Sequence, residues 1–152
     1  MGITVTNIDQ AVSFYLDVTG GSLDGPYEKF GPAVDAATGF PGVTVFLAFI
    51  NLDGGGVIEL AEYRHGSGEK IPTDTNRPGV AHPAFTVADL DAVMERVGRQ
   101  GFPAISEPKR ATAGPMENYR YVYVLGPDNV RVELLETPHL PTAVQPPSTG
   151  TH

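Results

Sequence analysis

Two glutamates stand at equivalent places in two similar segments of the chain. Glu59 lies in the segment VIELAE, and Glu133 lies 74 positions later in the segment VRVELLE. Each is a carboxylate inside an otherwise apolar stretch that has the composition of a strand. A glutamate that only faces water has no need to recur at the same place in a repeat. The recurrence therefore favours a shared role for the two carboxylates.

His82 is the third residue whose type and position point to chemistry. It stands in the segment VAHPAFTV, at the start of the second half of the chain. Burial of two carboxylates and an imidazole together is costly unless they share a cation. Carboxylate oxygens and a neutral imidazole nitrogen suit a divalent first-row metal ion. Glu59, His82 and Glu133 are the predicted metal ligands, although a lone glutamate or histidine in a strand more often faces water or serves the structure.

The elements that must position these residues form an internal repeat. The segment from Gly2 matches the segment from Ala84 after a shift of 82 positions, which aligns Asn7 with Asp89. Asparagine and aspartate are good helix N-caps, and apolar residues follow each of them at the spacing of one helix face. Two apolar strands are predicted after each helix, over 43–50 and 56–62 in the first copy and over 119–125 and 130–136 in the second.

Each copy therefore reads βαβββ. The remaining strands are assigned to 22–32 and 102–109, and the stretch 24–42 is predicted to be a loop that covers a cleft. The predicted fold class is α+β, in which two βαβββ modules form a curved, mostly antiparallel sheet around a cleft, with the helices outside. The predicted organisation is a first module over 1–63, a linker over 64–78, a second module over 79–136 and a Pro-rich, flexible tail over 137–152.

Composition excludes several classes of protein. The chain has no cysteine, so thiolate metal sites, disulfides and a cysteine nucleophile are absent. With a formal net charge of -8 and 10 Lys and Arg, it is poorly suited to nucleic acid or to an anionic membrane surface. No apolar run is long enough to span a membrane, and no signal pattern is visible at the N-terminus. A cytoplasmic location and a small-molecule partner are predicted.

Three stretches of the chain resemble motifs of the vicinal-oxygen-chelate superfamily, which includes glyoxalases, bleomycin resistance proteins and dioxygenases. They read G-I-T-V-x-N-I-D-x-A-x-x-F-Y-x-D-V-x-G-G, then R-P-G-V-A-H-x-A-F-T-V-x-D-L-D-A, then G-P-D-N-V-R-V-E-L-L-E. The resemblance covers residues 2–136. In metal-dependent members the ligands come from the first and fourth strands of each module, which implies Glu59, His82 and Glu133 here.

The resemblance also implies a function. It points to a glyoxalase-like lyase, isomerase or epimerase that acts on a small oxygenated substrate through a metal-stabilised enolate or enediolate. The cofactor is then a divalent ion of Ni, Zn, Fe, Co or Mn, and either Glu133 or Glu59 moves the substrate proton. Members of the superfamily tend to form dimers, so a homodimer is expected.

Two departures from the family pattern keep other interpretations open. The position equivalent to His82 in the first module falls one residue before Met1, so either the sequence starts just after a fourth ligand or its N-terminus is too short to supply one. Pro83 also has no amide to donate. These departures favour the alternative of a non-catalytic drug- or natural-product-binding protein of the bleomycin-resistance type. An extradiol-type dioxygenase ranks third, because such enzymes carry a histidine where Glu59 stands.

Overall fold

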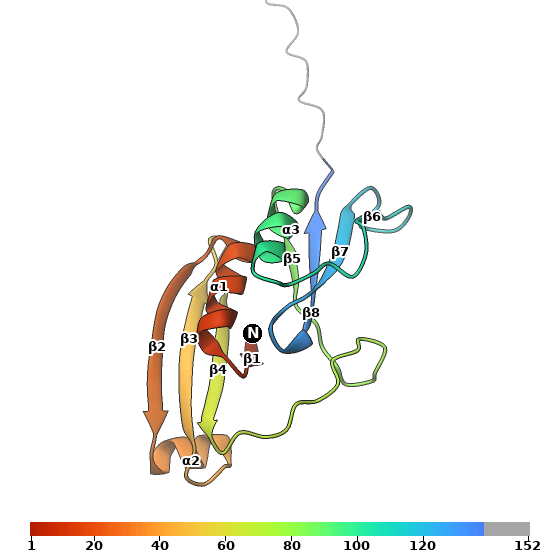
Figure 1. The fold of residues 1–152 in the computed structure, drawn as a ribbon. Coiled ribbons are helices and arrows are strands. Elements are labelled where there is room, and N and C mark those ends of the chain that lie inside the picture. The colour runs from red at the N-terminus through yellow and green to blue at the C-terminus, as the bar shows by residue number, and fades with distance from the viewer. Residues whose placement is uncertain (139–152) are drawn as a thin grey trace, which may run out of the picture.

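The protein contains two similar four-stranded sheets, one from each half of the chain (Figure 1). The structure is a computed structural model in which residues 1–138 are described, so the predicted tail lies outside the described residues from position 139 onward. The first half comprises β1 (Gly2–Thr4), α1 (Ile8–Thr19), β2 (Ser22–Phe30), α2 (Pro32–Thr38), β3 (Thr44–Asn51) and β4 (Val57–His65). The second comprises β5 (Ala84–Thr86), α3 (Leu90–Arg99), β6 (Lys109–Arg110), β7 (Arg120–Leu125), the 3₁₀ turn Pro127–Asn129 and β8 (Arg131–Glu136).

The two sheets have the same topology. Their strand orders are β1-β4-β3-β2 and β5-β8-β7-β6. In each sheet the first strand of the module pairs in parallel with the last one, and the other neighbours are antiparallel. The register places Glu59 opposite Gly2 and Glu133 opposite Ala84. The predicted α+β fold and the predicted repeat are therefore confirmed.

Both long helices begin at the predicted N-caps. The side chain of Asn7 accepts a hydrogen bond from the amide of Gln10, and the side chain of Asp89 accepts one from the amide of Ala92, each at 2.9 Å. These bonds satisfy amides that have no partner within the first helical turn. Helix α1 ends at Gly20, whose φ of 68° lies in the left-handed region that glycine adopts without strain.

A second pair of repeated glutamates also serves the helix starts. Glu62 accepts a hydrogen bond from the amide of Ile8 at 2.7 Å, and Glu136 accepts one from the amide of Leu90 at 2.8 Å. A carboxylate at this place also interacts favourably with the helix dipole. The last glutamate of each E-L-x-E segment is thus explained by helix capping, which leaves Glu59 and Glu133 as the carboxylates without that structural role.

Two details of the sequence prediction are corrected. The stretch 24–42 is not a cleft-covering loop, because most of it belongs to β2 and to the short helix α2. The strand predicted over 102–109 is reduced to an isolated bridge at Ala104 and to the two residues of β6. Neither α2 nor β6 contains a residue classed as buried, so neither has the apolar pattern that sequence reading relies on.

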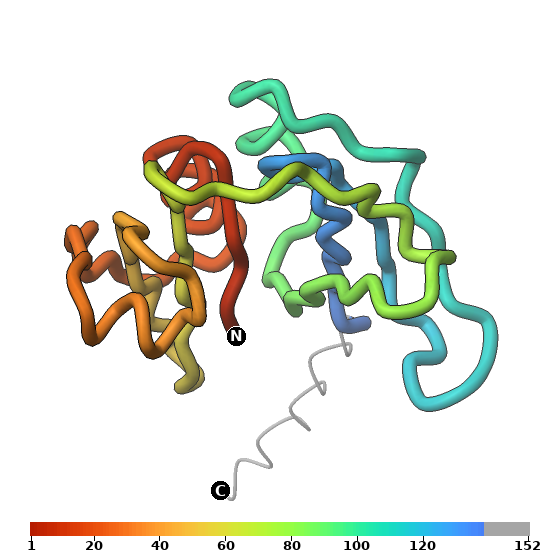
Figure 2. The backbone as a smooth tube through the Cα atoms, turned by 90° about the horizontal axis from the view of Figure 1, so that it is seen from below, coloured from red at the N-terminus to blue at the C-terminus, as the bar shows by residue number. Residues whose placement is uncertain are grey.

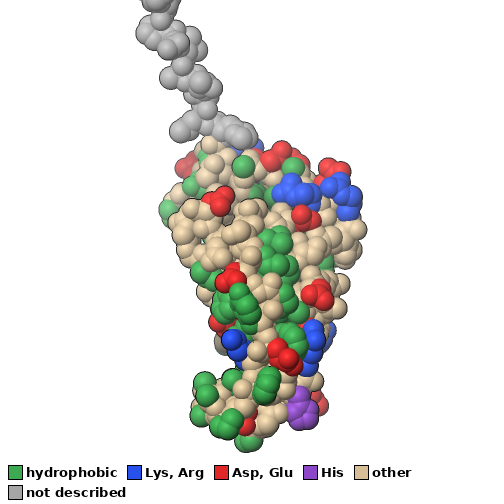
Figure 3. All heavy atoms as spheres, turned by 90° about the vertical axis from the view of Figure 1, so that its left-hand side faces the viewer, with side chains coloured by type: hydrophobic (Ala, Val, Ile, Leu, Met, Phe, Trp, Pro, Cys, Tyr) green, Lys and Arg blue, Asp and Glu red, His purple; other side chains and the backbone are tan. Residues whose placement is uncertain are grey.

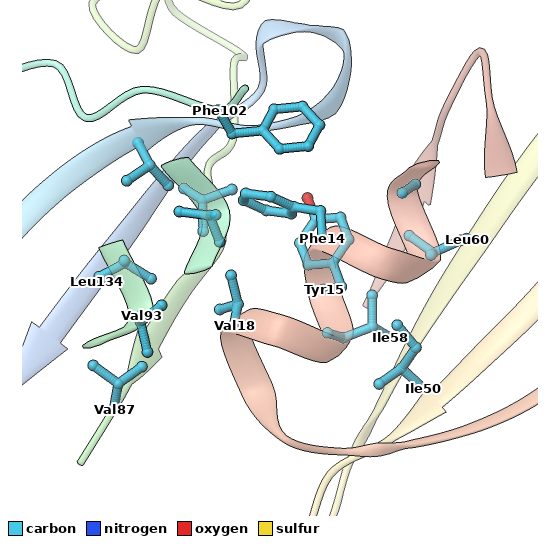
Figure 4. Close-up of a cluster of buried hydrophobic side chains, with 14 of the residues drawn as sticks. Phe14, Tyr15, Val18, Ile50, Ile58, Leu60, Val87, Val93, Phe102 and Leu134 are labelled. Carbon is cyan, nitrogen blue, oxygen red and sulfur yellow. The ribbon is translucent and has the colours of Figure 1, made fainter. Parts of the chain in front are cut away.

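A single apolar core joins the two modules. Helices α1 and α3 lie next to each other on the same side of the two sheets (Figures 1 and 2). Phe14 of α1 is fully buried, and its ring packs edge-on against Phe102 of the second module with 4.8 Å between ring centroids (Figure 4). Arg96 of α3 donates to the carbonyl of Asp17 at 2.9 Å. Because both modules contribute to this core, their relative position is fixed by packing.

The segment between β4 and β5 crosses from one module to the other (Figure 2). Lys70 of this segment forms an ion pair with Asp128 at 2.6 Å, and Thr73 donates to the carbonyl of Asn129 at 2.7 Å. Asp128 also accepts hydrogen bonds from the amide and hydroxyl of Thr6. Asp128 therefore ties the connecting segment and the first module to the turn between β7 and β8. In the described part of the chain, no helix has the length and apolarity needed to cross a membrane.

Candidate functional site

The alternation of side chains along the last strand of each module places Glu59 and Glu133 on the sheet faces that carry no helix. In β4 the neighbours Ile58 and Leu60 are buried in the core, whereas Glu59 is exposed. In β8 the flanking residues are likewise buried and Glu133 is partly exposed. Successive side chains of a strand point to opposite faces. Both carboxylates therefore lie on the helix-free side of the molecule.

His82 and Glu133 form a close pair on this side. The Nε2 atom of His82 lies 3.3 Å from the Oε2 atom of Glu133. Both side chains are partly open to solvent, with exposed fractions of 34% and 20%. The strand pairing brings them together, because the amide of Glu133 donates to the carbonyl of Pro83 at 2.9 Å. The pair can hold one proton between its two acceptor atoms, or turn both atoms toward a cation.

Pro83 changes the strand edge beside the pair. In the first module the corresponding residue is Met1, whose terminal amine donates to the carbonyl of Val57 at 2.8 Å. Pro83 has no N–H and cannot make the equivalent bond to the carbonyl of Arg131. The carbonyl of Pro83 still pairs with β8, so the register that carries His82 to Glu133 is kept.

Tyr123 contacts both members of the pair. It stands opposite Glu133 in the register of β7 and β8, and its ring lies edge-on to the His82 imidazole with 5.5 Å between centroids. Burial raises the pKa of Tyr123 above its usual value, and the nearby Glu133 carboxylate raises it further through its charge and a hydrogen bond. The hydroxyl of Tyr123 therefore stays protonated at neutral pH.

Glu59 has different surroundings. It lies in a recess of about 420 Å³ that is lined by Met1, Gly2, Phe49 and Val57. Among the described residues, none donates a side-chain or backbone hydrogen bond to the carboxylate of Glu59. In the same part of the chain, no three His, Asp or Glu side chains are arranged to hold a metal ion together. The structure thus joins two of the three predicted ligands and leaves Glu59 apart from them.

A larger cavity of about 450 Å³ lies between β1 and the connecting segment. His82 lines this cavity, and Met1 and Gly2 line both this cavity and the recess around Glu59. The size is within the range of pockets that bind small molecules. Apolar side chains from several elements form part of its wall, among them Ile3, Val5, Ile71, Val80 and Val130.

Large apolar side chains are also exposed on the first module. Seen from the side of β2, they gather over the middle and the lower end of the module (Figure 3). Phe30 and Phe40 are 68% and 56% exposed. Phe46 instead packs against the core and under the guanidinium of Arg64. Exposed apolar groups in such a cluster are typical of surfaces that contact another molecule.

Comparison with known proteins now identifies the family. Residues 1–134 match the sequence model of the Glyoxalase/Bleomycin resistance protein/Dioxygenase superfamily. The chain belongs to this superfamily. The resemblance read from the three sequence motifs is therefore confirmed.

The similar proteins carry names that describe different activities. The chain is 30% identical over 144 residues to a 2-epi-5-epi-valiolone epimerase from Actinomyces, an alignment that covers 89% of the chain and 76% of the relative. Among solved structures, a glyoxalase family protein from Bacillus cereus superposes with a TM-score of 0.77 at 23% identity, covering 90% of both chains. The fosfomycin resistance protein FosX from Listeria monocytogenes, solved with Mn(II) and sulfate, superposes with a TM-score of 0.55 at 16% identity, covering 91% of this chain and 89% of FosX.

The likeness to these structures shows the fold alone, and the geometry of the site comes from the residues of this chain. His82 and Glu133 converge as the shared register of the repeat implies, and Glu59 does not join them within one group. Tyr123 is not among the residues that the sequence analysis singles out. Its position opposite Glu133 follows from the strand register, whereas the alternation of tyrosines at the start of this strand indicates only that they share one face of the sheet.

Proposed function

We propose that the protein is an epimerase or isomerase that moves a proton next to the carbonyl group of a small polyhydroxylated ketone. The observation that carries this proposal is the 30% identity over 144 residues to a 2-epi-5-epi-valiolone epimerase. The site is compatible with it, because His82 and Glu133 offer acceptor atoms for a proton on an open sheet face. A histidine and a carboxylate at hydrogen-bond range are common general acids and bases.

The chain's own residues supply binding as well as proton transfer. The cavity of about 450 Å³ beside His82 has room for a molecule of this class. Tyr123 offers a hydroxyl beside Glu133 that can bind a hydroxyl or carbonyl oxygen of the substrate. Partial exposure of His82 and Glu133 leaves their reactive atoms within reach of a ligand that enters from the helix-free side.

We further propose that His82, Glu133 and Glu59 are ligands of a divalent metal ion. Their oxygen and nitrogen donors suit such an ion, and the close approach of His82 to Glu133 provides two of the three. When bound, the ion polarises the substrate carbonyl and stabilises the negative charge that develops as a proton leaves. His82 and Glu133 then orient the site, and a carboxylate of the chain accepts the proton.

The test uses tag-free protein, 2-epi-5-epi-valiolone and D₂O. We expect proton NMR to show conversion to an epimer, with deuterium entering at one carbon next to the carbonyl. Elemental analysis after mild dialysis is expected to show near 1:1 divalent metal, which is lost in Glu133→Ala and in His82→Ala. Glu117→Ala, on an exposed loop, is the matched control and should keep both properties. Retention of the metal by both site variants would remove the proposed metal site, and absence of turnover would remove the proposed substrate.

A second candidate is a binding protein that sequesters a natural product without chemistry. The observation that favours it is the separation of Glu59 from the His82–Glu133 pair in the described part of the chain. The apolar walls of the larger cavity also suit a hydrophobic ligand. It predicts no metal, even after metal is added back, together with tight binding of an aromatic natural product that is recovered unchanged.

A homodimer and a cytoplasmic location stay predictions. The exposed apolar side chains of the first module provide a surface that a second copy of the chain can bury. Sedimentation equilibrium measures the mass directly: twice the 16.1 kDa of the chain is the expected result, and the monomer mass at all concentrations would contradict it.

A further inference from the structure

Arg131 lies beside the His82–Glu133 pair on the same open sheet face. It precedes Glu133 by two positions in β8, and side chains two positions apart in a strand share one face. The parallel register pairs Ala84 with Glu133, and the pairing reaches Pro83, whose carbonyl accepts from the amide of Glu133. His82 precedes Ala84 by two positions, as Arg131 precedes Glu133. The guanidinium of Arg131 therefore starts from a point next to His82.

This guanidinium is already bound to a carboxylate of the segment that connects the modules. The Nη2 atom of Arg131 donates to one oxygen of Asp74 at 3.2 Å, and the Nε atom of Arg77 donates to the other oxygen at 3.3 Å. Hydrogen bonds from Arg77 and Arg131 hold the pKa of Asp74 below its usual value, so the carboxylate is ionised at neutral pH. Asp74 thus takes the place that a phosphate or carboxylate ligand would occupy between two arginines.

The three side chains line a surface hollow of about 610 Å³, which we call the arginine recess. Converging guanidinium groups are a common means of binding phosphate and carboxylate groups. Asp74 belongs to the same chain, and its neighbour Thr73 donates to the carbonyl of Asn129 at 2.7 Å. The Asp74 carboxylate therefore competes with a free anion at a high effective concentration. A negatively charged ligand group must displace it before it can bind the arginines.

The larger cavity beside His82 follows the same rule. Among the described residues, the one lysine or arginine that lines this cavity is Lys70, and it pairs with Asp128 at 2.6 Å. Each lysine or arginine of the cavity and of the arginine recess is thus bound to a carboxylate. An anionic ligand has to break one of these ion pairs, whereas a hydroxylated neutral ligand needs only hydrogen bonds.

We propose that Asp74 determines the charge of the ligand that the site accepts. By occupying Arg131 and Arg77, it makes the site accept an uncharged polyhydroxylated ketone and reject the phosphate and carboxylate analogues of that ketone. This inference rests on the proposed epimerase or isomerase function and adds to it a specificity-determining residue. Asp74 acts through the two arginines and does not touch the ligand. Removal of its charge converts the arginine recess into an anion site beside His82.

The first experiment needs no substrate. Inorganic phosphate is titrated at neutral pH and constant ionic strength, while proton–nitrogen NMR follows the Nε–H groups of the arginines. Asp74→Asn keeps the size of the side chain and removes its charge, and it is expected to bind phosphate about 10-fold or more tightly than the wild type. Asp53→Asn removes the same charge from an exposed turn and is the matched control, which is expected to behave as the wild type.

Two further variants test whether the effect passes through the arginines. Arg131→Gln in the Asp74→Asn background is expected to abolish the gain in phosphate affinity. Asp74→Glu restores a carboxylate and is expected to keep the weak binding of the wild type. In Asp74→Asn the imidazole resonances of His82 are expected to shift with the same dissociation constant, because the bound phosphate lies close to the ring. Circular dichroism confirms that each variant is folded.

The second experiment measures deuterium entry into 2-epi-5-epi-valiolone in the presence of phosphate at constant ionic strength. In Asp74→Asn, phosphate at about ten times its dissociation constant is expected to raise KM about 10-fold and to leave kcat unchanged, as a competitor for the ligand site does. The wild type in the same buffer is expected to keep its KM. That comparison also controls for any removal of metal ions by phosphate.

The outcomes separate the failures. Phosphate binding by the wild type as tight as by Asp74→Asn would overturn the proposal, as would a gain that appears in Asp53→Asn or survives Arg131→Gln. A gain without a shift of the His82 resonances would place the anion away from the site and overturn the role in specificity. Absence of exchange in the wild type would remove the proposed substrate, and the phosphate titration with its His82 readout would still decide the role of Asp74.

Discussion

The two modules share their backbone construction and differ in the side chains on their open faces. Each has an Asx-capped helix, a glutamate that accepts from the first helical amide and a parallel pair between its first and last strands. The open faces instead pair Glu59 with Phe49 and Glu133 with Tyr123. The repeated features are those that any βαβββ module needs in order to fold, whereas the unrepeated ones surround the candidate site.

The same contrast appears where the modules meet. Phe14 of α1 corresponds to Arg96 of α3 after the shift of 82 positions. Phe14 is buried between the modules, and Arg96 reaches across the helix pair to a backbone carbonyl. At this position the first helix supplies a ring at the centre of the shared core, whereas the second helix, which adds Leu90, Val93 and Val97 to that core, supplies a polar contact. Equivalent positions of a repeat diverge once the two copies pack against each other.

The largest expected effect of a substitution comes from the centre of this contact. Phe14→Ala removes a fully buried ring that packs against Phe102 and Tyr15, and is expected to destabilise the protein by about 4 kcal/mol. Arg96→Ala removes hydrogen bonds to one carbonyl and is expected to cost about 1 kcal/mol. Urea unfolding measures both free energies. Equal losses would contradict the unequal contributions of the two helices.

The two capping glutamates provide a closer comparison. Glu136 is buried and accepts hydrogen bonds from Arg120 and from the amide of Leu90. Glu136→Ala leaves both of these donors without this acceptor and is expected to lower the free energy of unfolding by about 3 kcal/mol. Glu62 is slightly more open, and Glu62→Ala is expected to cost about 2 kcal/mol. Urea unfolding of both variants measures the difference. A larger loss in Glu62→Ala would reverse the comparison.

The smallest expected effect concerns a set of side-chain contacts that is present in only one of the two modules. Asp128 binds Thr6 and Lys70, whereas Gly54 at the equivalent turn of the first module has no side chain. Asp128→Asn keeps a residue that tolerates the positive φ of 58° and is expected to cost about 1 kcal/mol at neutral pH. Asp53→Asn, in the turn of the first module, is the control and should be neutral.

The cost of Asp128→Asn is expected to depend on pH. Burial opposes ionisation of Asp128, but hydrogen bonds from Lys70 and Thr6 outweigh it and hold the pKa of Asp128 below its usual value. A lowered folded-state pKa contributes stability that is complete above roughly pH 5 and is lost as pH falls through the folded-state pKa. The difference between wild type and variant should therefore shrink on acidification. A difference in stability between wild type and variant that grows at low pH would contradict a stabilising role for the ionised Asp128.

Much of the fold was readable from the sequence because its signals are local. The caps Asn7 and Asp89 act on amides three residues away, and strand composition and turn residues act over a few positions. The repeat extended these signals to the register that places Glu59 and Glu133 at equivalent points. The helix α2 was missed, because a short helix with no buried face carries no apolar period.

The sequence by itself determined the two-module fold, the superfamily and the three residues that merited attention. Only the tertiary structure decided that His82 meets Glu133, that Tyr123 lies beside them and that Glu59 lies apart from them. The physical reason is that strand period and helix capping depend on neighbours a few residues away. The surroundings of a carboxylate depend instead on which distant strands pack beside it and on the side chains that those strands carry.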